Sequence, residues 1–439
     1  MNVERMKTIV LTFLVALSLV LTVALWNYQP KYYDEIENTD YLYETKLNGQ
    51  TKKIEELITP YRVLFRESDG LYGLKDHSDL SIIFSEIQKW QIDEVDYYTI
   101  SGREVKKPNV EIAFPTELPL TVLQTMFTLE EKETFPDWEF DRIIFRLVNQ
   151  QQALEVIFAS SHHDQTLNAK IQNSEAYAYL ERYFINKDLL MEMISFTVNG
   201  QDPFYLPAAE IELPKRTFTV NKLQTKPMIN ILFSDPSLVE TSITSFGERN
   251  YTDGNKQLSV YNDYMYFVNP LTSDDHDVDK QNMIRRSINF VNDHQGWTNE
   301  FRLTSMDEVE NTIEYQMTVD YYPVFHPSDF SVIEIEWKNQ QIHAYNRPLM
   351  KLATLFHSDG QKETLSSGYA VMDYLENHQD QYDPFLIEDI QIGYTMKARE
   401  GISHIMSLEP EWYIKYNGRW QLLFSHEEQG EETDAVGTN

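Results

Sequence analysis

The sequence predicts an α+β protein in which an N-terminal transmembrane helix precedes a multi-domain extracytoplasmic region of antiparallel sheets and packed helices. Three observations predict this class. A charge-free apolar run lies at residues 8–30, short strand-like and helix-like segments alternate over the rest of the chain, and part of the C-terminal half repeats after 84 residues. The repeat predicts that the last two domains are duplicates.

The apolar run at residues 9–26 is long enough to cross a bilayer, because a helix rises 1.5 Å per residue and the hydrocarbon core is about 30 Å thick. Arg5 and Lys7 precede the run, and Trp26 and Tyr28 follow it at the expected interface. Basic residues stay on the cytoplasmic side. We therefore expect a cell-membrane protein with a single span, a cytoplasmic N-terminus and an extracytoplasmic body. The alternative is a secretory signal peptide, but the run exceeds the usual length and lacks a small-x-small cleavage site.

Small residues recur along the expected span. Thr12 and Ala16 lie on one four-residue ridge, and Ser18 and Thr22 lie on a second. Small side chains let helix backbones approach closely in lipid, where packing and hydroxyl hydrogen bonds drive association. These four residues form the predicted helix-packing face. The alternative is ordinary span composition, since Ala, Ser and Thr are frequent in such helices.

Composition restricts the partners. Lys and Arg number 37 against 69 Asp and Glu, and the net charge of −32 argues against nucleic acid and against binding of the body to anionic lipid. The 27 Tyr and 23 Phe residues supply material for large cores, so a disordered stalk is excluded. With no cysteine, each domain must hold by packing alone and thiol chemistry is absent.

The first ectodomain is expected at residues 31–205, ending at the proline-rich stretch 203–214. Apolar residues at helical spacing predict helices at 78–87, 119–127 and 174–184. Short β-rich runs predict strands at 110–114, 142–147 and 154–158.

The second half of the chain contains the repeat. Val260-Tyr261-Asn262 recurs as Ala344-Tyr345-Asn346, and helices that end at His294 and His378 share the same offset. Strands are expected to begin at Phe301 and Phe385. We predict one αβ domain at 206–325 and its copy at 326–426, with chance similarity as the alternative.

Each predicted copy closes with paired strands, at 335–342 and 413–420. The second pair turns at Asn417-Gly418, which suits a type I′ turn. Residues 427–439 are acidic and poor in apolar side chains, so they are expected to form a disordered tail.

Candidate sites for chemistry are few. Asp275, Asp277 and Asp279 match the opening of a calcium loop, but Lys280 replaces the required Gly, and acids that precede a helix favour its dipole. A solvated turn explains His162-His163-Asp164 better than metal binding. His294 and His378 repeat as helix-end residues, where the helix dipole favours the imidazolium form. No hydrolase, phosphate-loop or metalloprotease motif occurs, and we predict no catalytic, cofactor-binding or metal residues.

Taken together, the leader, the apolar run, the acidic cysteine-free body and the Pro410–Ile414 strand before Asn417-Gly418-Arg419-Trp420 resemble the YycH (WalH) family of Firmicutes. The resemblance covers nearly the whole chain, although its motifs are positional rather than catalytic. It implies a membrane-anchored accessory protein that usually restrains the YycG/WalK sensor histidine kinase of cell-wall metabolism, together with a companion anchored protein, YycI. It also implies a three-domain ectodomain whose last two domains share a topology.

We therefore expect a non-enzymatic regulator whose membrane helix, and in part its ectodomain, contacts a sensor kinase and a companion protein. A homodimer is also possible. The alternatives are an extracytoplasmic ligand- or wall-binding module without a signalling role, and a wall hydrolase.

Overall fold

The computed structural model describes residues 7, 11, 14–15, 17–18 and 45–424, except for gaps at 69, 99–107, 130–134, 164–165, 198–202, 273–279, 327, 329, 357–360 and 400–403. The chain divides into two units, Met1–Glu44 and Thr45–Asn439. In the first unit the described residues are helical and exposed. Among the described residues, no helix is both long enough and apolar enough to cross a bilayer.

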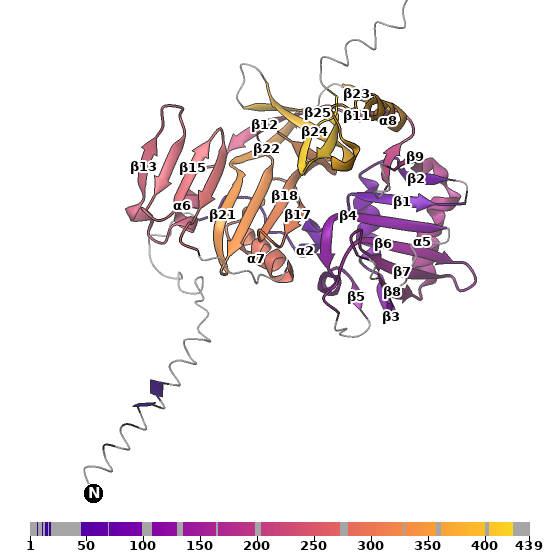
Figure 1. Cartoon of the computed structure of the whole chain (residues 1–439), viewed down its shortest axis with the longest axis horizontal. Helices are drawn as coiled ribbons and strands as arrows, with labels where there is room; N and C mark the ends of the chain where they lie inside the picture. The colour runs from indigo at the N-terminus through magenta and orange to yellow at the C-terminus, as the bar shows by residue number, and fades with distance from the viewer. Residues whose placement is uncertain are drawn as a thin grey trace, which may run out of the picture. The chain divides into compact units, whose positions relative to one another are not determined.

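The second unit is α+β and begins with a mixed sheet (Figure 1). In the part of the chain that the structure describes, ten strands pair in the order β10-β9-β2-β1-β4-β6-β7-β8-β3-β5. Their bounds are β1 Arg62–Arg66, β2 Leu71–Leu74, β3 Gln91–Tyr98, β4 Asn109–Pro119, β5 Thr128–Leu129, β6 Glu139–Val148, β7 Ala153–Ala159, β8 Thr166–Ile171, β9 Leu190–Phe196 and β10 Phe204–Pro207. The helices with it are α2 Ile54–Leu57, α3 Asp79–Ile87, η1 Leu120–Val122, α4 Leu123–Met126, α5 Ser174–Ile185 and η2 Lys187–Leu189.

One face of this sheet carries the apolar core under α3 and α5. The predicted apolar positions of α3, namely Leu80, Ile83, Phe84 and Ile87, are all buried. In α5, Tyr183 packs on the Phe65 ring of β1 at 5.1 Å. The sequence-predicted helices and strands of this region are confirmed, with ends that differ by a few residues.

A second sheet follows in the order β13-β14-β15-β16-β21-β20-β18-β19-β24-β25-β12-β22, with β17 on β18 and β26 on β25 (Figure 1). Its strands are β12 Arg216–Lys222, β13 Glu240–Ile243, β14 Arg249–Thr252, β15 Gln257–Tyr261, β16 Tyr264–Val268, β17 Phe301–Asp307, β18 Thr312–Val319, β19 Tyr322–Phe325, β20 Val332–Lys338, β21 Gln341–Pro348, β22 Met350–Phe356, β24 Ile387–Ala398, β25 Ile405–Tyr416 and β26 Arg419–Leu422. A small sheet pairs β11 Ile211–Pro214 with β23 Lys362–Leu365. The helices are α6 Lys226–Leu232, η3 Pro236–Leu238, α7 Lys280–Asp293, α8 Gly368–Asn377 and η4 Pro384–Leu386.

The predicted repeat is only partly visible in this order of elements. Both α7 and α8 end directly before the expected histidines and lead into antiparallel hairpins, β17–β18 and β24–β25. However, β20 and β21 pair with β18 and β16, so hydrogen bonds of one sheet cross the predicted boundary at 325/326. The duplication therefore stays a prediction.

One local expectation was wrong. The strand after α8 begins at Ile387, not at Phe385, because Pro384 starts the 3₁₀ turn η4, in which the Asp383 carboxylate accepts a hydrogen bond from the Phe385 amide. The predicted turn at Asn417-Gly418 is confirmed: both residues have positive φ, and β25 pairs with β26 across it.

Candidate functional site

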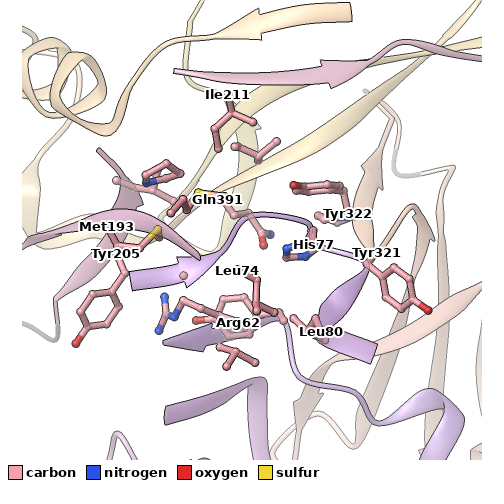
Figure 2. A pocket seen from close by; sticks show the side chains of 18 of the residues that line it. Arg62, Leu74, His77, Leu80, Met193, Tyr205, Ile211, Tyr321, Tyr322 and Gln391 are labelled. Carbon is pink, nitrogen blue, oxygen red and sulfur yellow. The ribbon is translucent and has the colours of Figure 1, made fainter. Parts of the chain in front are cut away.

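A cavity of about 130 Å³ lies where the N-terminal sheet meets the second sheet (Figure 2). We call it the junction cavity. The N-terminal region contributes the start of β1, the end of β2, the start of α3, and parts of β9 and β10. The remaining walls come from β11, from the β18–β19 turn, and from β24 and β25. Ligand sites occur preferentially at such domain junctions.

The walls of the junction cavity are largely apolar and aromatic. The lining apolar residues are Val63, Leu74, Leu80, Met191, Met193, Pro207, Ile211, Pro323, Ile390, Ile392 and Trp412. The ring of Tyr205 of β10 contacts two guanidinium groups, with Arg62 4.7 Å and Arg66 4.9 Å from its centre. Because cations are attracted to an aromatic face, these two contacts help to hold Arg62 and β10 together at the cavity edge.

Three polar side chains at the junction cavity lack a hydrogen bond within the described part of the chain. The buried Nε of Arg62 has no partner, although its guanidinium lies over the rings of Tyr61 and Tyr205. The amide of Gln391 and the hydroxyl of Tyr61 also line the cavity. Figure 2 shows Gln391 near the middle of the cavity, with Arg62 and Tyr205 on one side and His77 on the other.

His77 at the start of α3 is held as a neutral imidazole. Its ring stacks on Tyr322 at 4.3 Å and hydrogen-bonds to the backbone of Tyr321. Burial, together with the positive charge of Arg302, lowers the pKa of His77 to about 4. His77 therefore joins the N-terminal region to the β18–β19 turn without carrying charge at neutral pH.

Two ionisable groups at or beside the junction cavity, Asp389 and Tyr61, have raised pKa values. Burial raises the pKa of the Asp389 carboxyl above its usual value, while nearby Arg62 opposes that shift. Burial also raises the pKa of the Tyr61 hydroxyl, so this group stays protonated at neutral pH. The described lining thus combines a permanent cation, Arg62, with neutral donors, and the pKa of the nearby Asp389 carboxyl is raised.

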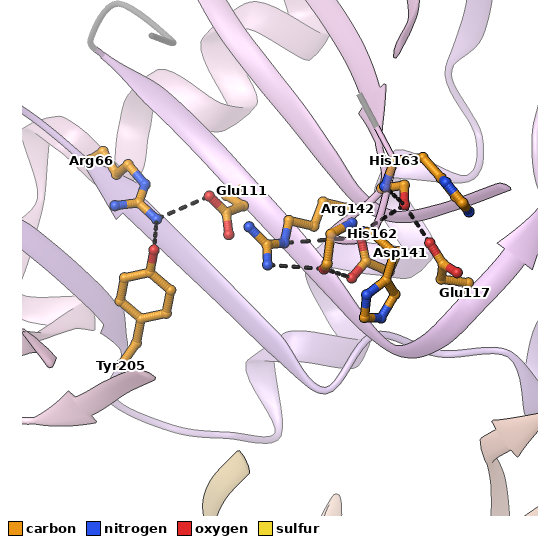
Figure 3. A network of polar contacts seen from close by, with 10 residues as sticks. Arg66, Glu111, Glu117, Asp141, Arg142, His162, His163 and Tyr205 are labelled. Carbon is orange, nitrogen blue, oxygen red and sulfur yellow. Dashed lines mark hydrogen bonds and ion pairs between the residues drawn. The ribbon is translucent and has the colours of Figure 1, made fainter. Parts of the chain in front are cut away.

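A polar network that shares Tyr205 with the junction cavity runs across neighbouring strands (Figure 3). Arg66 donates to Glu111 at 3.0 Å and to the Tyr205 hydroxyl at 2.7 Å. Further along, Arg142 donates to Ser161 at 3.0 Å, and the Ser161 hydroxyl donates to Asp141. These cross-strand pairs make one face of the sheet polar.

The network ends in a cluster that the sequence did not reveal. Glu117 of β4, Glu139 of β6 and His163 after β7 each offer one ligand atom, and the three atoms lie within 4.8 Å of one another. Pairing of Pro119 with Glu139 brings the glutamates together, so no local spacing could have shown them. The donor types suit a divalent cation, but the Ser160 hydroxyl already donates to Glu117.

The expected protonation of His294 was wrong. His294 is 2% exposed, and burial together with the charge of Arg347 lowers its pKa to about 3. Its Nε2 lies 3.0 Å from the Tyr345 hydroxyl, which accepts from Arg347 at 2.9 Å. Desolvation therefore outweighs the helix dipole at this helix end.

The other predicted residues have mixed outcomes. Lys7 and Ser18 are helical and exposed. Arg5, Thr12, Ala16, Thr22, Trp26 and Tyr28 lie outside the described residues, as do the acids at 274–279, Asp164 and the tail at 427–439. Arg62, His77 and Gln391 were missed by sequence reasoning because they are far apart in the chain and match no motif.

Two family models, one relative and one solved structure together match nearly the whole chain, and all four are YycH proteins or domains. The model for the N-terminal domain of YycH protein matches residues 4–184, and that for its C-terminal domain matches residues 201–429. The "Two-component system WalR/WalK regulatory protein YycH" of Bacillus subtilis is 25% identical over 445 residues, which cover 95% of this chain and 96% of the relative. The crystal structure of YycH from Bacillus subtilis has the same fold, with a TM-score of 0.72 at 19% identity over 87% of this chain and 99% of that one.

Proposed function

The chain belongs to the YycH family, and from this membership we propose that it is a membrane-anchored, non-enzymatic regulator of a WalK-like sensor histidine kinase in a two-component system. The observation that carries the proposal is the match over nearly the full length to a protein named as a WalR/WalK regulatory protein. In this proposal the chain restrains the kinase and acts with a companion anchored protein of the YycI type.

The proposed topology is a single span with the body outside the cell. It is supported by the charge-free run at residues 9–26 and by Arg5 and Lys7 before it. Protease added to intact protoplasts is expected to digest nearly the whole chain. Protection of the body from protease would contradict this topology.

The regulatory role is tested by deleting the gene and measuring expression from promoters under the cognate response regulator. Loss of restraint predicts increased output of genes that the phosphorylated regulator activates, and crosslinking in membranes should recover the kinase with the chain. A variant with residues 8–28 replaced by an unrelated span is expected to keep its membrane location and lose regulation. Full regulation by that variant would move the kinase contact to the ectodomain, and unchanged output after deletion would favour a wall-binding module instead.

The proposed packing face is tested by adding bulk on its two ridges. Ala16→Phe and Ser18→Phe are expected to weaken kinase crosslinking, whereas Leu17→Phe, off both ridges, is the matched control. Interhelical contacts in membranes contribute about 0.6–2 kcal/mol, so each change should weaken association roughly threefold to thirtyfold. Equal crosslinking by all three variants at equal abundance would contradict the packing face.

A further inference from the structure

The junction cavity has the properties of a binding site rather than of a packing defect. A cavity left by imperfect packing is lined by apolar groups and stays dry. This cavity instead gathers the Arg62 guanidinium, the Gln391 amide and the Tyr61 hydroxyl, none of which has a hydrogen bond within the described residues. The Nε of Arg62 is buried without a partner, which costs about 1–3 kcal/mol, so this donor at the cavity indicates a missing acceptor.

We propose that the junction cavity binds a small monocarboxylate with a compact apolar or aromatic body. The guanidinium of Arg62 presents a planar fork of donors that matches the two oxygens of a carboxylate. Gln391 and Tyr61 supply further donors at the same cavity. The remaining wall, from Leu74 and Met193 to Trp412, suits the apolar body.

The size of the junction cavity limits the body of the ligand. Its volume is about 130 Å³. An engineered apolar cavity of about 150 Å³ holds benzene, so one six-membered ring or a branched aliphatic group fills the space here.

Charge selects an anion over a cation. Arg62 lines the cavity, Arg302 acts on the His77 ring at its other side, and the imidazole itself is neutral. Asp389 and Asp141 act on Tyr61, and Asp76 acts on His77, but none of these three carboxyls is among the residues that line the cavity, whereas Arg62 is. In a chain of net charge −32, a cavity whose described lining holds a guanidinium and no carboxylate is suited to a carboxylate ligand.

Three probes of one shape test the proposal: benzoate, benzyl alcohol and benzylamine. Each is titrated calorimetrically into the full chain in detergent micelles. The Leu74→Trp variant, whose larger side chain fills the cavity, measures partition of the probes into the micelles. Benzoate is expected to bind at least tenfold more tightly than benzyl alcohol, and benzylamine is expected to give only the micelle background. Equal binding of benzylamine and benzoate would overturn the ligand class.

Variants of lining residues, with a matched control elsewhere, test whether benzoate binds in the junction cavity or at another place on the chain. Arg62→Met should weaken benzoate about tenfold or more while leaving benzyl alcohol within twofold, since a hydrogen bond to a charged group contributes about 1.5–3 kcal/mol. Arg249→Met, at an exposed arginine of β14, is the control and should change neither. If Arg62→Met does not fold, Gln391→Leu replaces it and should weaken benzoate threefold or more. Binding of benzoate that these variants and Leu74→Trp leave unchanged would overturn the site.

Discussion

The ends of α7 and α8 occupy corresponding places in the predicted repeat, yet their histidines differ in environment. His294 after α7 is 2% exposed and lies 3.0 Å from the Tyr345 hydroxyl, in a cluster with the fully buried Arg347. His378 after α8 is half-buried, stacks on Tyr374 at 4.1 Å and bonds to the carbonyl of that same residue at 2.8 Å. His294 is therefore packed in the core, whereas the ring contacts of His378 are made within its own helix.

The difference shows what a repeated sequence does and does not determine. The helix end is a local property, and both α7 and α8 have it. The partner of the histidine comes from another strand, and β21 supplies Tyr345 and Arg347 only to the first helix. Gly296 makes the approach possible, because a Cβ there would lie 2.5 Å from His294 Nε2 and 2.7 Å from Arg347 Nη1.

The largest effect in this comparison is expected from Arg347→Met. Arg347 donates to the Gly296 carbonyl at 2.7 Å, to Thr298 at 3.0 Å and to Tyr345 at 2.9 Å. Breaking a buried charged network costs about 3–5 kcal/mol. Chemical denaturation should show a loss of that size in the free energy of unfolding.

The control is Arg216→Met, because Arg216 pairs with Asp320 at 2.7 Å near the surface. Exposed ion pairs contribute about 0–1 kcal/mol. If the Arg347 and Arg216 variants lost equal stability, the cluster at the end of α7 would not be the anchor that its burial indicates.

The two histidines themselves should differ next. His294→Leu leaves the buried Tyr345 hydroxyl with fewer partners and changes a packed shape, so we expect a loss of about 2–3 kcal/mol. His378→Leu keeps an apolar side chain against Tyr374 and should cost less than about 1 kcal/mol. Denaturant unfolding of the two variants measures the comparison directly, and equal losses would contradict it.

The buried histidine also predicts a pH dependence. The pKa of His294 is lowered to about 3, so between pH 6.5 and about 3 the unfolded chain binds a proton that the folded chain does not. The stability from neutral burial is fully present above pH 6.5 and is lost as pH falls. From pH 7 to pH 5 this one group lowers the free energy of unfolding by about 2 kcal/mol.

Unfolding titrations at several pH values check this sign. His294→Leu should lose about 2 kcal/mol less than the natural chain between pH 7 and pH 5, so their difference nearly disappears at pH 5. Tyr345→Phe keeps the histidine and its burial and should retain the full slope. A His294→Leu curve parallel to that of the natural chain would show that His294 is not held neutral.

These contrasts mark where sequence reasoning succeeds. Short-range sequence patterns were sufficient to predict α3 and the Asn417-Gly418 turn. The four predicted apolar positions of α3 are all buried, and both turn residues have positive φ. Each depends on residues within one turn or one hairpin, and local periodicity and turn chemistry carry that information.

The candidate site could not be predicted in this way. Arg62 and Gln391 are separated by most of the chain and meet only through the packing of two sheets. The protonation of His294 was mispredicted for the same reason, since burial by β21 is a tertiary effect that the helix-end rule omits. Register between distant strands sets both, and a single sequence does not encode register in a local pattern.

The smallest expected effect concerns the turns of the two paired-strand segments, 335–342 and 413–420. Asn339-Gln340 joins β20 to β21 with φ of 44° and 62°, and Asn417-Gly418 joins β25 to β26 with φ of 49° and 77°. Glycine adopts positive φ without the clash that a side chain brings. Gln340→Gly should therefore stabilise the chain by about 0.5–1 kcal/mol, and Gly418→Gln should destabilise it by a similar amount.

Denaturant unfolding of the two single variants and of the double variant measures how the free energy of unfolding changes when Gln and Gly are exchanged between the two turns. The hairpins are distinct, so the effects should add and the double variant should match the natural chain within about 0.5 kcal/mol. In Gly418→Gln the backbone amide can still donate to Glu388, at 2.6 Å in the natural turn, so the change isolates the backbone conformation. A loss in Gln340→Gly would show that the Gln340 side chain contributes more than its strained φ costs. The two hairpins would then differ in their contacts, as the two histidines do, and not only in turn chemistry.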